Sequence, residues 1–428
     1  MKEVAKQNQP LSDASIQLPA LPNELWLYIF HYVLRNNPFL PSSQSGAFVL
    51  SWVCDRWRSW VISEPRFWTK IHLSSSPVGT GRKEKLEKLV DLCLNRSKHY
   101  KLDIILTDFR CNQRPEDKRI HLLTLPLFFL NTSDRWRSLL LNIAAGPRML
   151  NRFSRLKGHL KSLKSCTIIY RLQRQFSYNP KPIEFLENAT QLQALCLMTH
   201  LFPTKVLFNK LTDVDLVPDM NSLEFPLTVK EFLDILGRCP NISRLRLVCN
   251  LSDNDGPLSR PVATHRKIRE LHIFGRYIGI LQNGDTIFDF LNLPFLTIFS
   301  ITSHQGQASW GILHDSLDRF LAQIQGLLRL QLHFHHQMHF AMREPLKHLR
   351  LTPKLQHLFI EIKNMGYSKD DILSGLLEDD GSYAWPSALQ RLYYWTINCD
   401  SIFAISSTPC RQNPPYLQRS TITQEAST

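Results

Sequence analysis

The chain has 428 residues, of which 43% are hydrophobic and 21% are charged, so it can bury a sizeable core and is not globally disordered. Its net charge of +14 favours acidic partners, whether protein, RNA or a membrane surface. No apolar run approaches the ~18 residues of a membrane span, and residues 1–10 contain no apolar signal-peptide stretch. Nine scattered cysteines without a CxxC pair indicate reduced thiols, so we expect an intracellular protein of cytoplasm or nucleus with no membrane partner.

The composition of the N-terminal region changes at about residue 18. Residues 1–17 are polar and are expected to form a disordered tail, whereas residues 18–73 are dense in Leu and Trp at helical spacing. One apolar stripe repeats every four residues: Leu21, Leu25, Ile29 and Val33. A second apolar segment, Phe48 to Val61, follows a loop. So small an all-α module cannot bury this many large apolar groups by itself, and we expect some of them to anchor on a partner.

Short blocks of this module occur in a recognisable order. They are Leu21-Pro22-Asn23-Glu24-Leu25, Ile29-Phe30, Trp52-Val53-Cys54-Asp55-Arg56-Trp57, Pro65-Arg66-Phe67-Trp68 and Ile71. In this order and spacing the module resembles an F-box of the form found in fungal proteins. It departs from that pattern in Phe67, where Leu is commoner, and in the long loop from Asn36 to Ala47.

The resemblance implies a function as well as a fold. F-box modules dock on the Skp adaptor of Skp–cullin–F-box (SCF) ubiquitin ligases, and C-terminal repeats present a protein substrate. The chain would thus be a substrate receptor whose partners are a Skp-family adaptor, through it a cullin, and an unidentified protein target. The residues that would form or support the adaptor-facing surface are Leu21, Pro22, Leu25, Ile29, Phe30, Val53, Cys54 and Trp57.

Residues 74–83, with Gly79-Thr80-Gly81, are interpreted as a linker, and residues 84–400 as a degenerate repeat array. Triplets of the form apolar-x-x-apolar-x-apolar recur about every 28 residues from Trp136/Leu139/Leu141 to Leu389/Leu392/Tyr394. Their central residues are Leu139, Cys166, Leu195, Val214, Leu245, Leu271, Phe299, Leu330, Leu358 and Leu392. Each triplet predicts a short strand whose intervening residue faces solvent on a concave surface.

Segments between the triplets begin with acidic residues or a capping box and then turn apolar, which predicts helices. They are Thr228–Leu236, Asp285–Leu291, Asp315–Ile324 and Asp370–Leu377. One strand and one helix per unit is typical of leucine-rich repeats. We therefore predict an α/β fold, with a three-helix F-box followed by an irregular leucine-rich-repeat horseshoe, and a second disordered tail over residues 401–428.

Two groups of residues are candidates for substrate contact. His333 and His335 would face the concave surface, but no Cys or carboxylate lies between His333 and Arg343 to complete a zinc site, so no metal is predicted. The basic stretch from Arg148 to Arg174 contains no acid and suits an acidic or phosphorylated target. Its candidate contact residues are Lys161, Lys164, Arg171 and Arg174.

Catalytic motifs are absent from the sequence. It contains no Gly-x-Ser-x-Gly or His-Glu-x-x-His pattern, and Gly79-Thr80-Gly81 lacks the spacing of a phosphate loop. We therefore expect no enzyme activity and no cofactor. Two alternatives to the receptor hypothesis remain: a non-catalytic interaction scaffold outside ubiquitination, and a basic repeat protein that binds nucleic acid, which the scarcity of interleaved aromatic residues disfavours.

Overall fold

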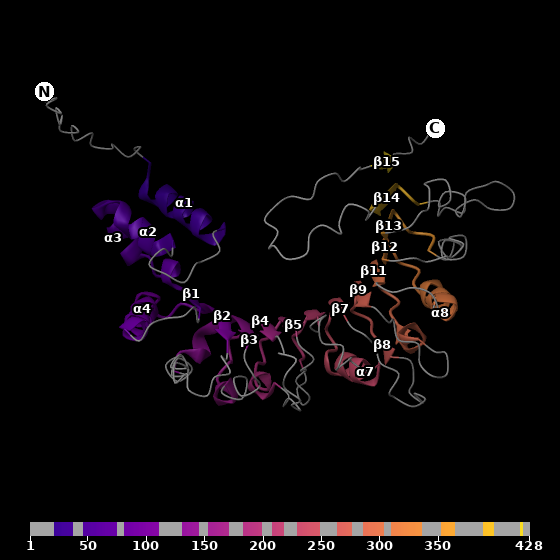
Figure 1. The fold of residues 1–428 in the computed structure, drawn as a ribbon, viewed down its shortest axis with the longest axis horizontal. Helices are drawn as coiled ribbons and strands as arrows, with labels where there is room; N and C mark the ends of the chain where they lie inside the picture. The colour runs from indigo at the N-terminus through magenta and orange to yellow at the C-terminus, as the bar shows by residue number, and fades with distance from the viewer. Residues whose placement is uncertain are drawn as a thin grey trace, which may run out of the picture.

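The computed structural model describes residues 21–36, 46–74, 81–110, 131–144, 153–170, 183–198, 208–217, 229–248, 263–275, 286–303, 310–335, 352–363, 388–397 and 420–422. The chain is a mixed α/β protein in which three helices precede a large, mainly parallel sheet. The sheet follows an arc: its strands line the inner side, and helices α4, α7 and α8 lie on the outer side (Figure 1).

The helical part begins with α1 (Asn23–Asn36), directly after Pro22, whose carbonyl accepts hydrogen bonds from the first turn. The second apolar segment, from Phe48 to Val61, spans two helices, α2 (Gly46–Val53) and α3 (Asp55–Ser63). They are separated by Cys54, whose backbone is extended. A 3-10 turn, η1 (Pro65–Trp68), leads from α3 into the sheet.

Over the described residues the main sheet has 13 strands, and those before β15 follow one another in chain order across it. The strands are β1 (Lys70–Ser74), β2 (Leu102–Arg110), β3 (Trp136–Ala144), β4 (Ser165–Tyr170), β5 (Ala194–Met198), β6 (Asp213–Leu216), β7 (Arg244–Val248), β9 (Glu270–Gly275), β11 (Ile298–Ser303), β12 (Arg329–His335), β13 (His357–Lys363), β14 (Arg391–Ile397) and β15 (Ser420–Ile422). Pairing is parallel from β1 to β14 and antiparallel between β14 and β15.

The predicted triplets coincide with these strands. Their central residues pair in one unbroken register from Leu139 on β3 to Leu392 on β14. From Trp136 to Ile360, every triplet residue is buried in one continuous hydrophobic core. The period-2 alternation of a strand therefore sends the triplet residues into the core and the residues between them to the inner side of the arc.

Backbone hydrogen bonds also tie successive units together just ahead of the strands. The amide of Lys164 donates to the carbonyl of Arg137, Gln193 donates to Lys164, and Thr212 donates to Gln193, each at 2.8 Å. The same tie continues unit by unit to Gln390, which donates to Gln356. Each unit thus adds apolar burial and backbone hydrogen bonds to its neighbours, which is the usual energetic basis of stacked repeats.

Among the described residues, one predicted helix on the outer side takes a different form. Helix α7 (Val229–Arg238) and helix α8 (Trp310–Ala322) coincide with two of the predicted segments. The segment Asp285–Leu291 instead forms a 3-10 turn, η6 (Ile287–Phe290), with a Thr286–Asp289 capping box. It runs directly into β10 (Leu291–Asn292), which pairs with β8 (Ala263–Thr264). The predicted helix at Asp370–Leu377, the cap residue Thr228 and the N-terminal tail lie outside the described residues.

Three boundaries differ from those predicted. The sheet begins at Lys70, inside the segment assigned to the helical module, because Trp68, Ile71 and Leu73 are buried with the spacing of the later triplets. Helix α4 (Gly81–Arg96) starts inside the expected linker, and β2 precedes the first predicted strand. At the other end, β15 lies within residues 401–428, predicted to be a tail, and pairs with β14.

Candidate functional site

The three N-terminal helices have their own hydrophobic core, separate from that of the sheet. Helix α1 contributes Trp26, Phe30 and Leu34, which follow one another at four-residue spacing and are buried. Trp57 on α3 packs against Phe30 with ring centroids 4.6 Å apart and against Trp26 at 5.5 Å. Phe67 and Trp68 of η1 complete this core, so its interior is filled by aromatic side chains.

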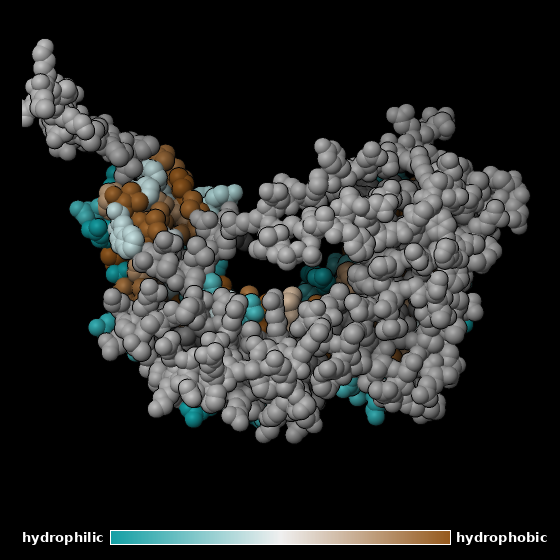
Figure 2. All heavy atoms as spheres, viewed as in Figure 1, coloured by the Kyte–Doolittle hydropathy of each residue, from teal (hydrophilic) through white to brown (hydrophobic). Residues whose placement is uncertain are grey.

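The same helices leave an unusual number of large apolar side chains exposed. We call this set the apolar surface: Leu25, Tyr28, Ile29, Tyr32 and Val33 of α1, and Val49, Trp52 and Val53 of α2. Tyr28 is 71% exposed and Trp52 is 58% exposed. Figure 2 shows hydrophobic residues gathered over these helices at one end of the arc. Apolar groups concentrated in this way on a small module mark an interaction site.

The residues predicted to face the adaptor divide between this surface and the core. Pro22, Leu25, Ile29 and Val53 are exposed, and Leu21, Cys54 and Trp57 are half-buried. Phe30 is buried and supports the surface from below. The predicted set omits Tyr28, Tyr32, Val33, Val49 and Trp52. The sequence of α1 could have predicted these residues, because α1 is apolar on nearly all sides. A helix that covers a core with one side only is polar on the other side.

Charged residues lie around the base of the helical core. The Glu64 carboxylate accepts a hydrogen bond from Arg66 at 2.7 Å, and this bond lowers the pKa of Glu64. The ring of His31 packs on Phe67 with centroids 4.5 Å apart. Burial, and then the positive charge of Arg66, lower the pKa of His31, so its imidazole is neutral at pH 7.

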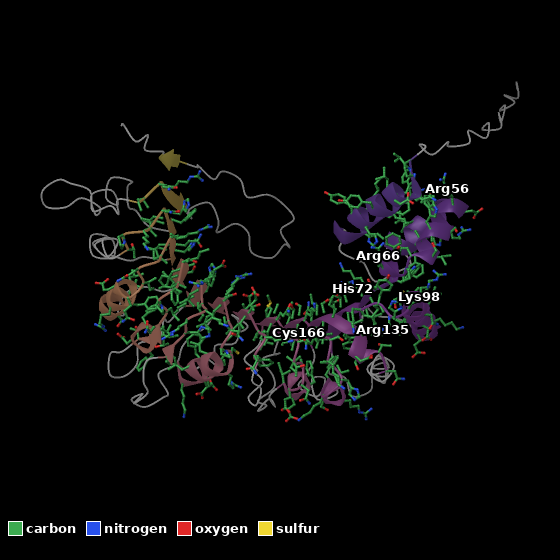
Figure 3. All side chains as sticks on the ribbon, turned by 180° about the vertical axis from the view of Figure 1, so that it is seen from behind. Arg56, Arg66, His72, Lys98, Arg135 and Cys166 are labelled. Atoms are coloured by element: carbon green, nitrogen blue, oxygen red, sulfur yellow. The ribbon has the colours of Figure 1, made fainter. Side chains whose placement is uncertain are left out.

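Several contacts fix the helical part to the start of the sheet. The Trp68 indole donates to the carbonyl of Val61 at 2.8 Å, and the guanidinium of Arg96, from α4, lies 4.4 Å from the Trp68 ring centroid. Cys93 of α4 packs against both hydrophobic cores. Arg135, directly ahead of β3, donates to the hydroxyl of Ser97, directly after α4, at 2.8 Å. Figure 3 shows Arg66 and Arg135 on either side of this junction.

From β1 to β14, one register position per strand forms a continuous row on the inner side of the sheet. In register order the row is His72, Ile105, Leu140, Thr167, Cys196, Asp215, Arg246, His272, Ser300, Gln331, Phe359 and Tyr393. The chemistry of this row changes along the arc: neutral residues on β2 to β5 are followed by Asp215 on β6 and Arg246 on β7.

At the centre of the inner side, opposite charges offset one another. Arg244 lies 3.8 Å from the Glu270 carboxylate, and Arg246 stacks over the ring of Phe274 at 4.9 Å. Burial lowers the pKa of His272, and Glu270 partly opposes this effect. The centre therefore offers both positively and negatively charged hydrogen-bonding groups to a ligand.

The residues predicted to touch a substrate are not brought together. Lys161 and Lys164 are exposed in the turn ahead of β4, at the edge of the sheet, where Lys101 donates to the Ser162 hydroxyl at 2.7 Å. His333 is half-buried on β12, and five strands separate β12 from β4. The backbone of His335 pairs with Lys363, while Arg171 and Arg174 lie outside the described residues.

Over the described ranges, no three His, Cys, Asp or Glu side chains come together in a way that could hold a metal ion. Across the same part of the chain, every helix is too short or too polar to cross a membrane. Comparison with known proteins gave no match to any family model and no significant match to a curated protein.

Proposed function

We propose that this chain is the substrate-recognition subunit of an SCF-type ubiquitin ligase. Helices α1–α3 act as an F-box that docks on a Skp-family adaptor, and the adaptor in turn recruits a cullin. The sheet and its outer helices act as an irregular leucine-rich-repeat horseshoe that presents a protein target. The chain performs no covalent chemistry and works inside the cell.

The observation that carries this proposal is the apolar surface. The core beneath it is already filled by Trp26, Phe30 and Trp57, so the exposed residues on α1 and α2 have no place in the module's own interior. Full burial of a side chain such as Leu25 or Trp52 on a partner would contribute about 1.5–3 kcal/mol. A few such residues at the centre of an interface suffice to hold a specific complex.

The position of this surface in the sequence supports the same function. It includes Leu25, Ile29 and Val53, which belong to the blocks on which the F-box resemblance rests. Pro22 is exposed at the start of α1, next to the surface. The exposed apolar side chains and the sequence pattern thus support the same proposal, that this module docks on a Skp-family adaptor.

The mechanism is proximity. A target held on the inner side of the arc has a high effective concentration near the ubiquitin-charged enzyme that other subunits recruit. This effect requires a fixed geometry between adaptor and target. The Trp68–Arg96 stacking and the shared packing of Cys93 supply such a connection between α1–α3 and the sheet.

Co-purification tests the proposal. The full chain, co-expressed with a Skp-family adaptor, should elute with it as one complex on size exclusion, and addition of a cullin should shift that complex to a larger size. Elution of the chain apart from the adaptor would overturn the proposal. An adaptor complex that excludes cullin would favour an interaction scaffold outside ubiquitination.

A further inference from the structure

The C-terminal end of the inner side has a distinctive charge. Arg329 on β12, His357 on β13 and Arg391 on β14 are direct register partners on three adjacent parallel strands. Neighbouring strands lie about 4.8 Å apart, so these three basic side chains start from one short line across the sheet. Arg391 is exposed, and Arg329 and His357 are half-buried.

Arg329 is held in position by its neighbours. Its guanidinium lies 4.5 Å from the ring centroid of Phe359, which belongs to the next strand and to the inner row. The side-chain oxygen of Gln331, with the amide oriented to accept, lies 2.8 Å from Nη2 and 3.1 Å from Nε. A guanidinium fixed in this way loses less entropy when it binds an anion.

Acidic residues are few within these three strands. Strands β12, β13 and β14 contain one carboxylate in their sequence, Glu361, which occupies the register position of His333, two residues beyond Phe359. Burial lowers the pKa of His357 the most, and the positive charges of Arg391 and Arg329 lower it further. The two arginines therefore act together at this point of the inner side.

The other end of the inner side has a different character. Leu140, Ile169 and Met198, on β3 to β5, are half-buried and uncharged. The charged centre, where Arg244 pairs with Glu270, separates this apolar end from the basic end. A segment that lies along the arc therefore meets apolar groups at one end and cations at the other.

From this arrangement we propose that the basic end of β12 to β14 binds an anionic group of the target protein, either a carboxylate or a phosphate. Arg329 and Arg391 supply charge-assisted hydrogen bonds, and His357 adds a further polar group between them. The target segment lies across the strands, with its apolar part toward β3 to β5. This inference rests on the proposed function, since it assumes that the inner side holds the target.

Fluorescence anisotropy of the full chain in its adaptor complex tests the inference with three labelled fifteen-residue peptides, long enough when extended to reach from β4 to β13. All carry a Leu-Ile-Met segment at one end and, at the other, a cluster of phosphoserine, glutamate or serine. We expect the first two to bind and the serine peptide to bind at least about tenfold more weakly. The stronger of the two charged peptides identifies phosphate or carboxylate as the preferred anion.

The double variant Arg329→Ala/Arg391→Ala should weaken binding of the charged peptides about tenfold. Its matched control, Lys88→Ala/Arg266→Ala, removes the same charge from two exposed positions, one on α4 and one in the turn ahead of β9, and should change affinity less than about twofold. Equal binding of all three peptides, absence of binding, or a loss confined to the control variant would overturn the inference. Adaptor binding is measured for both variants as well. If it is retained, a loss of peptide binding cannot be due to failure of the proposed function.

Discussion

The ring of Trp57 packs edge-on against the ring of Phe30, with 4.6 Å between their centroids. This contact joins α3 to the buried side of α1 and gives Trp57 a structural role. Trp52, five residues earlier, is 58% exposed on α2. Two tryptophans in one sequence block thus have different roles, one in the core of the helices and one on the apolar surface.

Substitution separates the two roles. Trp57→Ala should lower the free energy of unfolding by about 2–4 kcal/mol, because it leaves a cavity against Phe30 and Trp26. Trp52→Ala should change it by less than about 0.5 kcal/mol. Urea unfolding followed by far-UV circular dichroism measures both. Equal effects would show that Trp52 also belongs to the core.

The junction between the helices and the sheet depends on Trp68. Trp68→Phe removes the indole donor to Val61 and the larger ring beneath Arg96, and should cost about 1–3 kcal/mol because the Val61 carbonyl loses its partner. Thermal unfolding compares it with Trp52→Phe as a control. An unchanged melting temperature for Trp68→Phe would contradict the role given to this contact.

Because of Asp289, the free energy of unfolding should depend on pH in the acidic range. Burial raises its pKa, but hydrogen bonds from Ser316, the Thr286 amide and Arg319 outweigh burial and lower the pKa below its ordinary value of 3.8. The contribution of Asp289 is therefore complete above that value and is lost as the pH falls below it.

Asp289→Asn should then destabilise the chain by about 1–2 kcal/mol at pH 7, with a smaller difference from wild type below pH 3.8. The exposed Asp134→Asn serves as the control and should have little effect at either pH. Melting temperatures across the pH range measure this, and a difference that grows on acidification would refute it.

Thiol reactivity should follow burial. Burial raises the pKa of Cys93 to about 11 and that of Cys239 to about 12, and it also raises the pKa of the fully buried Cys166. Because the thiolate is the reactive form, iodoacetamide at pH 8 should alkylate the half-exposed Cys54 before these three. Mass spectrometry of the native and the denatured chain checks the order, which early modification of Cys239 would contradict.

Much of the sheet could be predicted because the strand signal is local. The predicted triplet residues from Leu139 to Tyr394 pair in one continuous register, since each strand needs only an apolar side facing the core. Strand β1 was missed although Trp68, Ile71 and Leu73 have the same spacing, because these residues also fit the end of the helical module. Strand β2 was missed because exposed Lys101 stands where the triplet has an apolar residue.

The candidate sites were harder to predict because periodicity does not say which side of a helix is covered. Leu25, Ile29 and Val33 form a regular stripe that would suit a core, yet they are exposed, while Trp26 and Phe30 between them are buried. The line formed by Arg329, His357 and Arg391 depends on the register between strands about thirty residues apart, which no local pattern contains.

The central claim is that the apolar surface of α1 and α2 binds a Skp-family adaptor. Its most direct test is the dissociation constant of that complex, measured for the intact chain and for Leu25→Ala/Ile29→Ala/Trp52→Ala. The matched control Tyr100→Ala/Phe295→Ala/Leu328→Ala removes three apolar residues exposed elsewhere. We predict about a 100-fold loss for the first variant, and less than about twofold for the control. No binding by the intact chain, or equal affinity for all three proteins, would contradict the account.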